Sequence, residues 1–437
     1  MCWCIFSPFV SCPVHSSTVN KDSVISTMAI KKKSAHKSSI RKRHLALRTQ
    51  QAARSTYLRS CSLLLLIQCV RLRNNPNARL IGLTRLVILS YYKVAYNSNI
   101  QWNLPSPLRW HTSFDSFSSD VCYNFFRIEK HHLQRYFAAL RFDERCTTKN
   151  RLTFSGEEIM LRGYYEMVSG EDQFSIATNI FGRDQAAQSQ ALSYFVDHLY
   201  DTFSDLLLNN LDWWEEHGFM EQSRKAIIRK LAVHGLVVPE CRISAFIDCN
   251  CLETAVPGSG PIGQGGPAAL RWDDTVQRAF YNGWKSMHGL KHQTRENAFG
   301  MCEDMYGPTS LRKNDLRLLG NSRLNARLFN LPNQFGTYGD SIYPQLTNVC
   351  SGGPNTAVWK RLRCSIEWNY HVTSYDLFQL LSQFHKLRLL SSDRVAKFYT
   401  VATFLRNCHV AMYGGNCMKY FKLRLPENML ERYTRLV

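Results

Sequence analysis

The chain has 437 residues, with 54 Lys and Arg against 34 Asp and Glu, and a formal net charge of +20. Hydrophobic residues make up 45% and aromatic residues 12%, a globular composition that excludes wholesale disorder and collagen-like repeats. At about 150 residues per domain, the length allows two or three domains. No apolar run reaches the roughly 18 residues of a membrane-spanning helix, so we expect a soluble, basic protein without a membrane partner.

The positive charge is concentrated near the N-terminus. Residues 1–110 contain seventeen basic residues and a single acid, a net charge of +16, whereas residues 111–437 are close to neutral at +4. Two basic clusters, at 31–33 and 41–43, are separated as in a bipartite nuclear import signal, which predicts a nuclear protein. A solvated, disordered tail and an electrostatic arm for a polyanion both remain open.

The number and spacing of the cysteines are typical of an intracellular protein. There are 15 cysteines without a repeated spacing, in a chain far longer than disulfide-dependent secreted domains. Two groups could be interpreted as zinc ligands: Cys2, Cys4, Cys12 and His15, and Cys241, Cys249 and Cys251. Neither group has the two-pair spacing of a structural zinc site, so free or buried thiols are expected. The apolar start has no basic leader before it, which argues against a secretory signal.

Residues 1–115 have no pattern that specifies a domain, and we expect a basic, Cys-containing, poorly ordered extension there. Residues 120–236 are predicted to be helical. Ser155 precedes two acids and is expected to cap a helix whose apolar residues recur at helical spacing. Further helices are expected over 174–181, ending at Gly182, and over 185–207. Three short helices with a Gly turn suit either a helix-turn-helix DNA reader or a small bundle.

After residue 236 the pattern becomes mixed. Short strands are expected over the apolar segments 241–249, 278–284, 288–293, 298–305 and 335–338. Helices are expected over 314–328 and across most of 356–413, which together predict an α/β layer domain. Gly258, Gly260 and Gly263 have the spacing of a dinucleotide fingerprint, but Gly and Pro follow where a helix would be needed. We therefore interpret 257–267 as a loop.

Four acids occupy positions from which a metal-dependent phosphodiesterase could use them. Asp248 and Asp340 are expected at the ends of strands, Asp315 at the start of a helix and Glu367 within a helix. Cleavage of phosphodiesters commonly needs two divalent ions, and Mg²⁺ prefers carboxylate oxygens. Each acid has a structural alternative: a helix N-terminus for Asp315, a turn for Asp340, and a solvated ion pair with Arg363 for Glu367. Asp248 directly follows Phe246 and Ile247 on an expected core strand, where a buried carboxylate needs a hydrogen-bond or charge partner.

Taken together, the motifs of residues 120–420 resemble the PIF/Harbinger-type DDE transposases in their fungal form. The resemblance follows chain order through Phe246-Ile-Asp248-Cys249, Gln277-Arg-Ala-Phe-Tyr-Asn-Gly-Trp-Lys285, His288-Gly-Leu-Lys291, Gly307-Pro-Thr-Ser-Leu-Arg-Lys-Asn-Asp315, Ser322-Arg-Leu-Asn325, Gly339-Asp340-Ser-Ile-Tyr-Pro344, Arg363-x-x-x-Glu367-Trp368 and Leu405-Arg-Asn-Cys-His409. Upstream, Phe154-Ser-Gly-Glu-Glu158 and Phe181-Gly-Arg-Asp184 are similar to the family's helical N-terminal region. One departure is Cys249-Asn250, where many relatives have Gly-Thr-His.

The resemblance implies an RNase H-like core over 240–420, preceded by the helical segment over 120–236 and followed by a C-terminal tail, 421–437. It also implies two Mg²⁺ or Mn²⁺ ions that activate water for cutting at transposon ends, after which the freed 3′ hydroxyl attacks target DNA. Asp248 corresponds to the family's first acid and Glu367 to its helix-borne glutamate. The middle acid is Asp340 or Asp315; an RNase H layout favours Asp340, because the second ligand follows the fourth strand.

The same resemblance gives the basic residues a role. Lys360, Arg361 and Arg363 stand one turn before Glu367 and could hold a scissile phosphate. Lys285 and Lys291 are expected on the strands after the first acid, and solvated surface remains the alternative for both. Segment 150–210 becomes the candidate for recognising the terminal repeats. A Myb-like accessory protein is an implied partner, and homo-oligomerisation remains open. The alternatives are a domesticated DNA- or chromatin-binding protein that does not cut, and a ribonuclease or repair nuclease on the same core.

Overall fold

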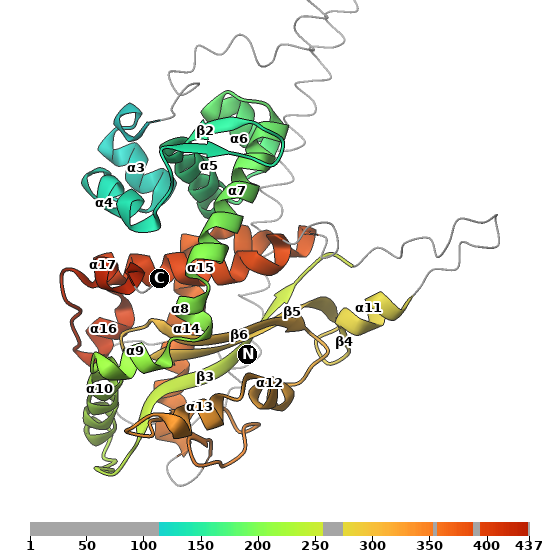
Figure 1. Cartoon of the computed structure of the whole chain (residues 1–437). Coiled ribbons are helices and arrows are strands. Elements are labelled where there is room, and N and C mark those ends of the chain that lie inside the picture. The colour runs from blue at the N-terminus through green and yellow to red at the C-terminus, as the bar shows by residue number, and fades with distance from the viewer. Residues whose placement is uncertain (1–112, 257–273, 353–355, 388–393, 436–437) are drawn as a thin grey trace, which may run out of the picture. The chain divides into compact units, whose positions relative to one another are not determined.

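The computed structural model describes residues 113–256, 274–352, 356–387 and 394–435, all within one compact unit that extends from Ser106 to Val437 (Figure 1). Several expectations concern segments outside these residues. They are the N-terminal extension up to residue 112 with its two basic clusters, the first cysteine group and the glycine-rich loop 257–267.

The first part of the described chain is helical, as expected. Its elements are η1 (Phe114–Ser116), α3 (Ser119–Phe126), α4 (Lys130–Leu140), β1 (Arg145–Thr147), β2 (Thr153–Ser155), α5 (Gly156–Ser169), α6 (Gln173–Ile176), η2 (Ala177–Phe181), α7 (Gln185–Phe203), α8 (Asp205–Leu208), α9 (Leu211–Glu216) and α10 (Phe219–Val233). The predicted cap of α5 is confirmed, because Ser155 Oγ accepts a hydrogen bond from the Glu158 N–H at 3.1 Å.

Two helices in this part differ from the expected ranges. The segment expected as one helix over 174–181 is a single α-turn, α6, continued by the π-helical turn η2, and it ends at Gly182 in the left-handed conformation. The next helix, α7, ends at Phe203, and α8 follows after Ser204. Sequence periodicity does not reveal such breaks, because the apolar residues continue at the same spacing across them.

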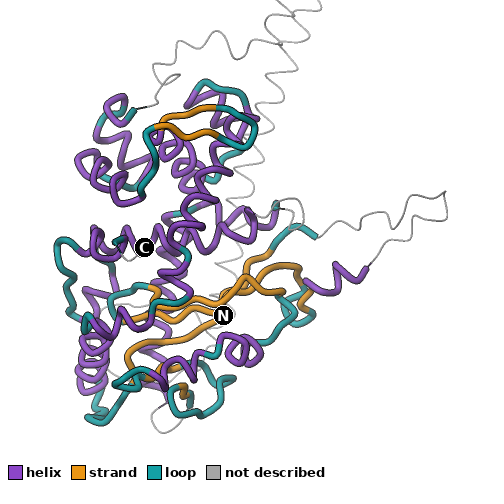
Figure 2. The backbone as a smooth tube through the Cα atoms, viewed as in Figure 1, coloured by secondary structure: helices purple, strands orange, loops and turns teal. Residues whose placement is uncertain are grey.

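A six-stranded mixed sheet lies between layers of helices (Figure 2). Its strands are β3 (Ile243–Glu253), β4 (Tyr281–Asn282), β5 (Met287–Asn297), β6 (Cys302–Ser310), β7 (Gly336–Tyr338) and β8 (Val349–Cys350). Across the sheet the order is β6, β5, β3, β7, β8, and β4 pairs with the start of β5. β3 is antiparallel to β5 and parallel to β7, β5 and β6 are antiparallel, and β7 and β8 are parallel. The expected α/β class is therefore confirmed.

The long pairing of β3 with β5 assigns each residue to one face of the sheet. Phe246 lies opposite Glu296, Asp248 opposite Thr294, and Cys251 opposite Lys291. Because side chains alternate along a strand, the first two pairs share one face and the third pair lies on the other. We call the face of Phe246 and Asp248 face A, and the face of Cys251 and Lys291 face B.

Different helices cover the two faces, and Figure 1 shows α15 on one side of the sheet with α12 and α13 on the other. The covering elements are α12 (Asp315–Ser322) and α13 (Leu324–Asn330) on face B, and α14 (Thr356–Leu377) and α15 (Arg394–Tyr413) on face A. On face B, Gln293 Nε2 donates to Ser322 Oγ at 3.0 Å. On face A, the ring of His292 lies 4.6 Å from that of Tyr399.

Several strand and helix boundaries expected from the sequence are wrong. β3 continues four residues beyond Cys249, so Asp248 lies in mid-strand, and its polar residues are accommodated because each has a cross-strand neighbour on β5. Segment 278–284, expected as a strand, contains the end of α11 (Asp274–Phe280), the two-residue β4 and the start of a turn. The helix expected over 314–328 is divided at Arg323, which has a φ of 52°.

The remaining described elements complete the helical layer: η4 (Gln379–Lys386), α16 (Asn416–Phe421) and α17 (Met429–Thr434). Segment 421–437, expected as a tail, includes α17, whose Met429, Leu430 and Tyr433 are buried. Among the described residues, none of the helices is both long and apolar enough to cross a membrane.

Candidate functional site

Two of the four acids are placed side by side by the parallel pairing of β3 and β7. Phe246 pairs with Tyr338 in this register. Asp248 and Asp340 each follow their paired residue by two positions, so both project from face A at neighbouring strands. The Ile342 N–H donates to Asp340 Oδ1 at 3.1 Å, which holds that carboxylate just after the end of β7.

Helix α14 brings Glu367 to the same face. Trp359 stacks on Tyr338 with ring centroids 4.8 Å apart, and Leu362 and Ile366 are buried in one cluster with Phe246 and Tyr338. At 3.6 residues per turn, the helix face that carries Leu362 and Ile366 also carries Arg363 and Glu367. Arg363 Nη1 lies 3.1 Å from Glu367 Oε1, and only 14% of each side chain is exposed. The ion pair expected from the sequence exists, but it is largely buried rather than solvated.

The acids affect one another's protonation. Burial raises the pKa of Glu367 well above its usual value, and the negative charge of Asp248 raises it further, against the opposing effect of Arg363. Burial also raises the pKa of Asp340, while the Ile342 N–H and Arg363 lower it and Asp248 raises it. This mutual repulsion shows that Asp248, Asp340 and Glu367 lie close enough to share one electrostatic environment.

Arg363 lies among these acids. Burial lowers the pKa of its guanidinium, but Glu367, Asp248 and Asp340 all raise it, and the net shift is upward. Arg363 forms its direct ion pair with Glu367, whose Oε1 receives no well-aligned hydrogen bond within the described part of the chain. Asp248, Asp340 and Glu367 thus all act on the Arg363 guanidinium, and their negative charge would also stabilise a bound cation.

Asp315 occupies the opposite face. Asn314 caps α12 by accepting from the Arg317 N–H, and Asp315 follows in the first turn, as the structural alternative predicted. Lys291 Nζ, on face B of β5, donates to Asp315 Oδ1 at 2.7 Å. Asp315 raises the pKa of Asp340 only as the weakest of its influences. Of the two candidates for the middle acid, Asp340 therefore shares the face of Asp248 and Glu367. Asp315 instead forms an ion pair with Lys291 on the other face.

The predicted basic contacts separate into two groups. Lys285, Lys360 and Arg361 are exposed, whereas Lys291 and Arg363 are committed to the carboxylates Asp315 and Glu367. Lys291 is only 5% exposed, so its alternative interpretation as solvated surface is wrong. Next to Lys285, the side chain of Trp284 is 94% exposed in the turn between β4 and β5.

One residue of this environment was not anticipated from the sequence. Glu296 lies on face A of β5, opposite Phe246, and it raises the pKa of Glu367. Burial raises its own pKa well above the usual value, and Thr294 Oγ1 donates to its Oε1 at 2.9 Å. The expected strand ended at Gln293; had it been extended to Asn297, the alternation of side chains would have placed Glu296 on this face.

The three sulfur atoms of the second cysteine group are not gathered at one point in the described part of the chain. Cys241, Cys249 and Cys251 are free thiols, and Cys249 Sγ instead lies 3.4 Å from the Tyr343 hydroxyl. Among the described residues, the one group of His, Cys, Asp and Glu with three ligand atoms close together is Glu129, His131 and His132. Sequence reasoning did not single out this group.

Comparison with known proteins adds no relative. No family model matches the chain, and neither a curated protein nor a solved structure is similar to it.

Proposed function

We propose that the chain is a metal-dependent DNA endonuclease of the DDE transposase type, acting on the terminal repeats of a transposon and joining the cut ends to target DNA. The observation that carries the proposal is the convergence of Asp248, Asp340 and Glu367 on one face of the sheet, from two parallel strands and the covering helix. The strand order supports an RNase H-like core, whose second acid follows the fourth strand: when the two-residue β4 is left out, the fourth strand of this sheet along the chain is β7, which Asp340 follows.

The donor set fits Mg²⁺ or Mn²⁺. Three carboxylates offer the hard oxygen ligands that these ions prefer. Burial raises the pKa values of Asp340 and Glu367, and the negative charge of Asp248 adds to both shifts, so a bound cation would be stabilised beside them. Bound divalent ions would polarise the scissile phosphate and lower the pKa of the attacking water. Asp248, Asp340 and Glu367 would hold them, and Asp315 is left out because its carboxylate balances Lys291.

Glu367 and Arg363 would have different roles in this reaction. Glu367 must lose its proton before it can act as a ligand, so cutting should increase as the pH rises through its raised pKa. Arg363 neutralises the acids, and on entry of the cations its guanidinium is available for the non-bridging oxygens of a phosphate.

DNA contacts are proposed around this site rather than on α7. Helix α7 contains no Lys or Arg that could bind phosphates, and its Asp197 and Asp201 are paired with Lys397. The exposed cations Lys360 and Arg361 lie near the start of α14, the helix that also carries Glu367. On the β4–β5 turn, Trp284 offers an exposed ring for base stacking beside Lys285. A helix-turn-helix role for α5 to α7 is therefore not favoured.

The test is nicking of supercoiled plasmid DNA by the full chain in Mg²⁺, Mn²⁺ or EDTA. Asp248→Asn and Glu367→Gln are expected to lower the rate by at least about a hundredfold while affinity for a DNA duplex changes less than about threefold. Asp376→Asn is the matched control, since Asp376 is an exposed acid on the same helix as Glu367 and should nick as the unaltered protein does.

The alternatives give different results. DNA binding without nicking in either cation would support the domesticated, non-cutting protein. Cleavage of RNA in preference to DNA would indicate a ribonuclease on the same core. Calorimetric titration with Mn²⁺ is an independent measurement: if Glu367→Gln bound Mn²⁺ with unaltered affinity and stoichiometry, the proposed ligand set would be refuted even in the absence of a cleavable substrate.

A further inference from the structure

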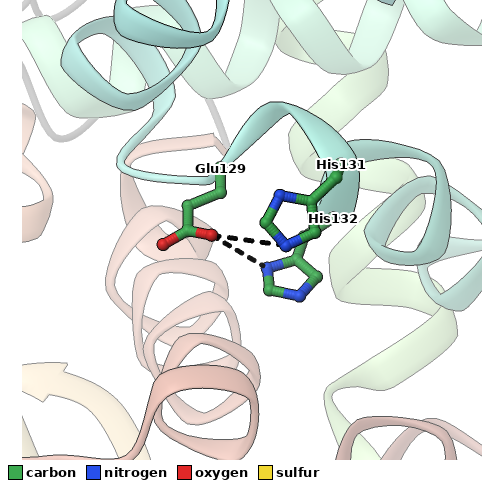
Figure 3. A group of neighbouring side chains, drawn as sticks. All are labelled: Glu129, His131 and His132. Carbon is green, nitrogen blue, oxygen red and sulfur yellow. Dashed lines mark ion pairs between the residues drawn. The ribbon is translucent and has the colours of Figure 1, made fainter.

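Three potential metal ligands within four residues lie together at the start of α4, remote in sequence from the acids of the sheet. Figure 3 shows the carboxylate of Glu129 facing the rings of His131 and His132. Glu129 Oε2 lies 3.3 Å from His131 Nε2 and 4.0 Å from His132 Nδ1, and the three ligand atoms all lie within 4.8 Å of one another. A tetrahedrally coordinated ion with metal–ligand distances of about 2.1 Å needs ligand atoms about 3.4 Å apart. Side-chain rotations that move the ligand atoms by about 1 Å would bring all three to this spacing.

The carboxylate of Glu129 is available for this purpose. Glu129 is the N-cap residue of α4, yet its side chain makes no capping hydrogen bond and turns to the imidazoles instead. The intervening Lys130 does not compete for it, because Lys130 Nζ donates to the carbonyl oxygen of Phe117 at 2.7 Å. Two imidazoles and one carboxylate therefore share a small volume without a competing cation from Lys130.

Tyr413 supplies an outer contact from another helix. The backbone N–H of Glu129 donates to the Tyr413 hydroxyl at 3.0 Å, and the same hydroxyl lies 3.0 Å from His132 Nδ1. Because the hydroxyl accepts from the N–H, its own O–H can donate to His132 Nδ1, which keeps this nitrogen unprotonated. A cation bound to Nδ1 would take the place of that hydrogen bond. Tyr413 is the last residue of α15, so an ion here would fasten the start of α4 to the end of α15.

We propose that Glu129, His131 and His132 form a second metal site that takes a borderline divalent cation, Zn²⁺ in the first instance, and not Mg²⁺. Two imidazole nitrogens favour Zn²⁺, whereas Mg²⁺ prefers an all-oxygen shell. Three protein ligands leave a fourth position for water, and the exposure of His131 opens that position to solvent. The positive end of the α4 dipole opposes any cation, so the site should be weaker than a closed structural zinc site.

The experiment is equilibrium dialysis of the untagged full chain against Zn²⁺, comparing the unaltered protein with His131→Ala. Since thiols elsewhere in the chain also bind zinc, the informative quantity is the difference between the two proteins. We expect His131→Ala to bind one equivalent less, or to bind that equivalent at least about tenfold more weakly. A large excess of Mg²⁺ should not displace the equivalent.

Folding is controlled in the same experiment. The His131 side chain is 70% exposed, so His131→Ala should retain its circular dichroism spectrum and melting temperature without metal. His385→Ala, at an exposed histidine of η4, should bind as much Zn²⁺ as the unaltered protein. Amide hydrogen exchange gives a local measurement, in which Zn²⁺ should slow exchange in the first turn of α4 only when His131 is present. Equal zinc uptake by the unaltered protein and His131→Ala would overturn the proposal.

Discussion

Lys291 is a buried cation in the sheet, and Asp315 balances its charge. Burial lowers the pKa of Lys291, but the hydrogen bond and the negative charge of Asp315 outweigh that effect and the net shift is upward. Removing one member of such a pair leaves an uncompensated buried charge. The ion pair thus gives the acid at position 315 a structural role.

We predict that Asp315→Asn destabilises the fold, while Asp340→Asn abolishes nicking. Breaking a buried pair costs roughly 3–5 kcal/mol, and the partial exposure of Asp315 places the expected loss at the low end. Urea unfolding measures this loss, and adding Lys291→Met should recover part of it. Normal nicking by Asp340→Asn, together with none by folded Asp315→Asn, would reverse the assignment of the middle acid.

Glu166 is a second residue whose protonation affects the fold. Its Oε1 accepts from Gln173 Nε2 and its Oε2 from Gln188 Nε2, each at 2.9 Å. Burial nevertheless raises its pKa from 4.5 to about 7. Because the folded state holds the proton more tightly than the unfolded chain, the free energy of unfolding must fall as the pH rises between these values.

We predict that Glu166→Gln removes this pH dependence. The native protein should lose up to about 1.4 kcal/mol of stability per pH unit between pH 4.5 and 7 through this group. A glutamine cannot ionise, and Gln173 can rotate its amide to accept from the new NH₂ group. Urea titrations at several pH values should therefore give a flatter profile for the variant, and equal slopes in the two proteins would exclude Glu166 as the cause.

At the scale of elements, α5 and α7 pack unusually closely. A Cβ atom built on Gly163 of α5 would lie 2.2 Å from Cγ of Phe195 on α7. Glycine costs up to about 1 kcal/mol relative to alanine in a helix interior, so its presence here is explained by the close approach of Phe195. Gly320 in α12 is the useful contrast, because a Cβ there would meet nothing within 4 Å.

Substitution of these two glycines by alanine should therefore change the free energy of unfolding in opposite directions. Gly163→Ala is expected to destabilise the protein by about 1–3 kcal/mol, since Phe195 must move out of a packed core. Gly320→Ala should be neutral or stabilising by up to about 1 kcal/mol, through helix preference alone. Thermal or urea unfolding of both variants tests the contact, and a stabilising Gly163→Ala would contradict the close packing of α5 and α7.

At the scale of the molecule, the excess positive charge and the acids of the candidate site lie in different parts of the chain. Residues 1–110 carry a net charge of +16, whereas the unit that begins at Ser106 contains every acid of the candidate site. Neutralisation of each phosphate by a basic group makes DNA affinity more dependent on salt. The two parts should therefore contribute separately to general DNA affinity and to cutting.

We predict that a protein limited to residues 106–437 keeps metal-dependent nicking but binds random-sequence duplex DNA more weakly and with a shallower salt dependence. Each lost phosphate contact should lower the slope of log affinity against log salt by about 0.9. Fluorescence anisotropy at several salt concentrations measures both quantities. Identical slopes for the full chain and residues 106–437 would show that the basic N-terminal segment does not contact DNA.

Local features of this protein could be predicted from the sequence. The caps Ser155 and Asn314, the helical position of Glu367 and the mixed α/β class follow from residue types and short spacings, because capping and side-chain periodicity depend on near neighbours. Element lengths were less predictable: β3 continues through polar residues only because β5 supplies a partner for each of them.

Only the tertiary structure decided which acids share a face. Phe246 and Tyr338 are far apart in the sequence, and nothing local specifies that they pair or that β3 lies between β5 and β7. That register puts Asp248 and Asp340 beside Glu367 and leaves Asp315 with Lys291 on the opposite face. A shift by a single residue would exchange the faces, because side chains alternate along a strand, and such a register is set by the packing of the whole sheet.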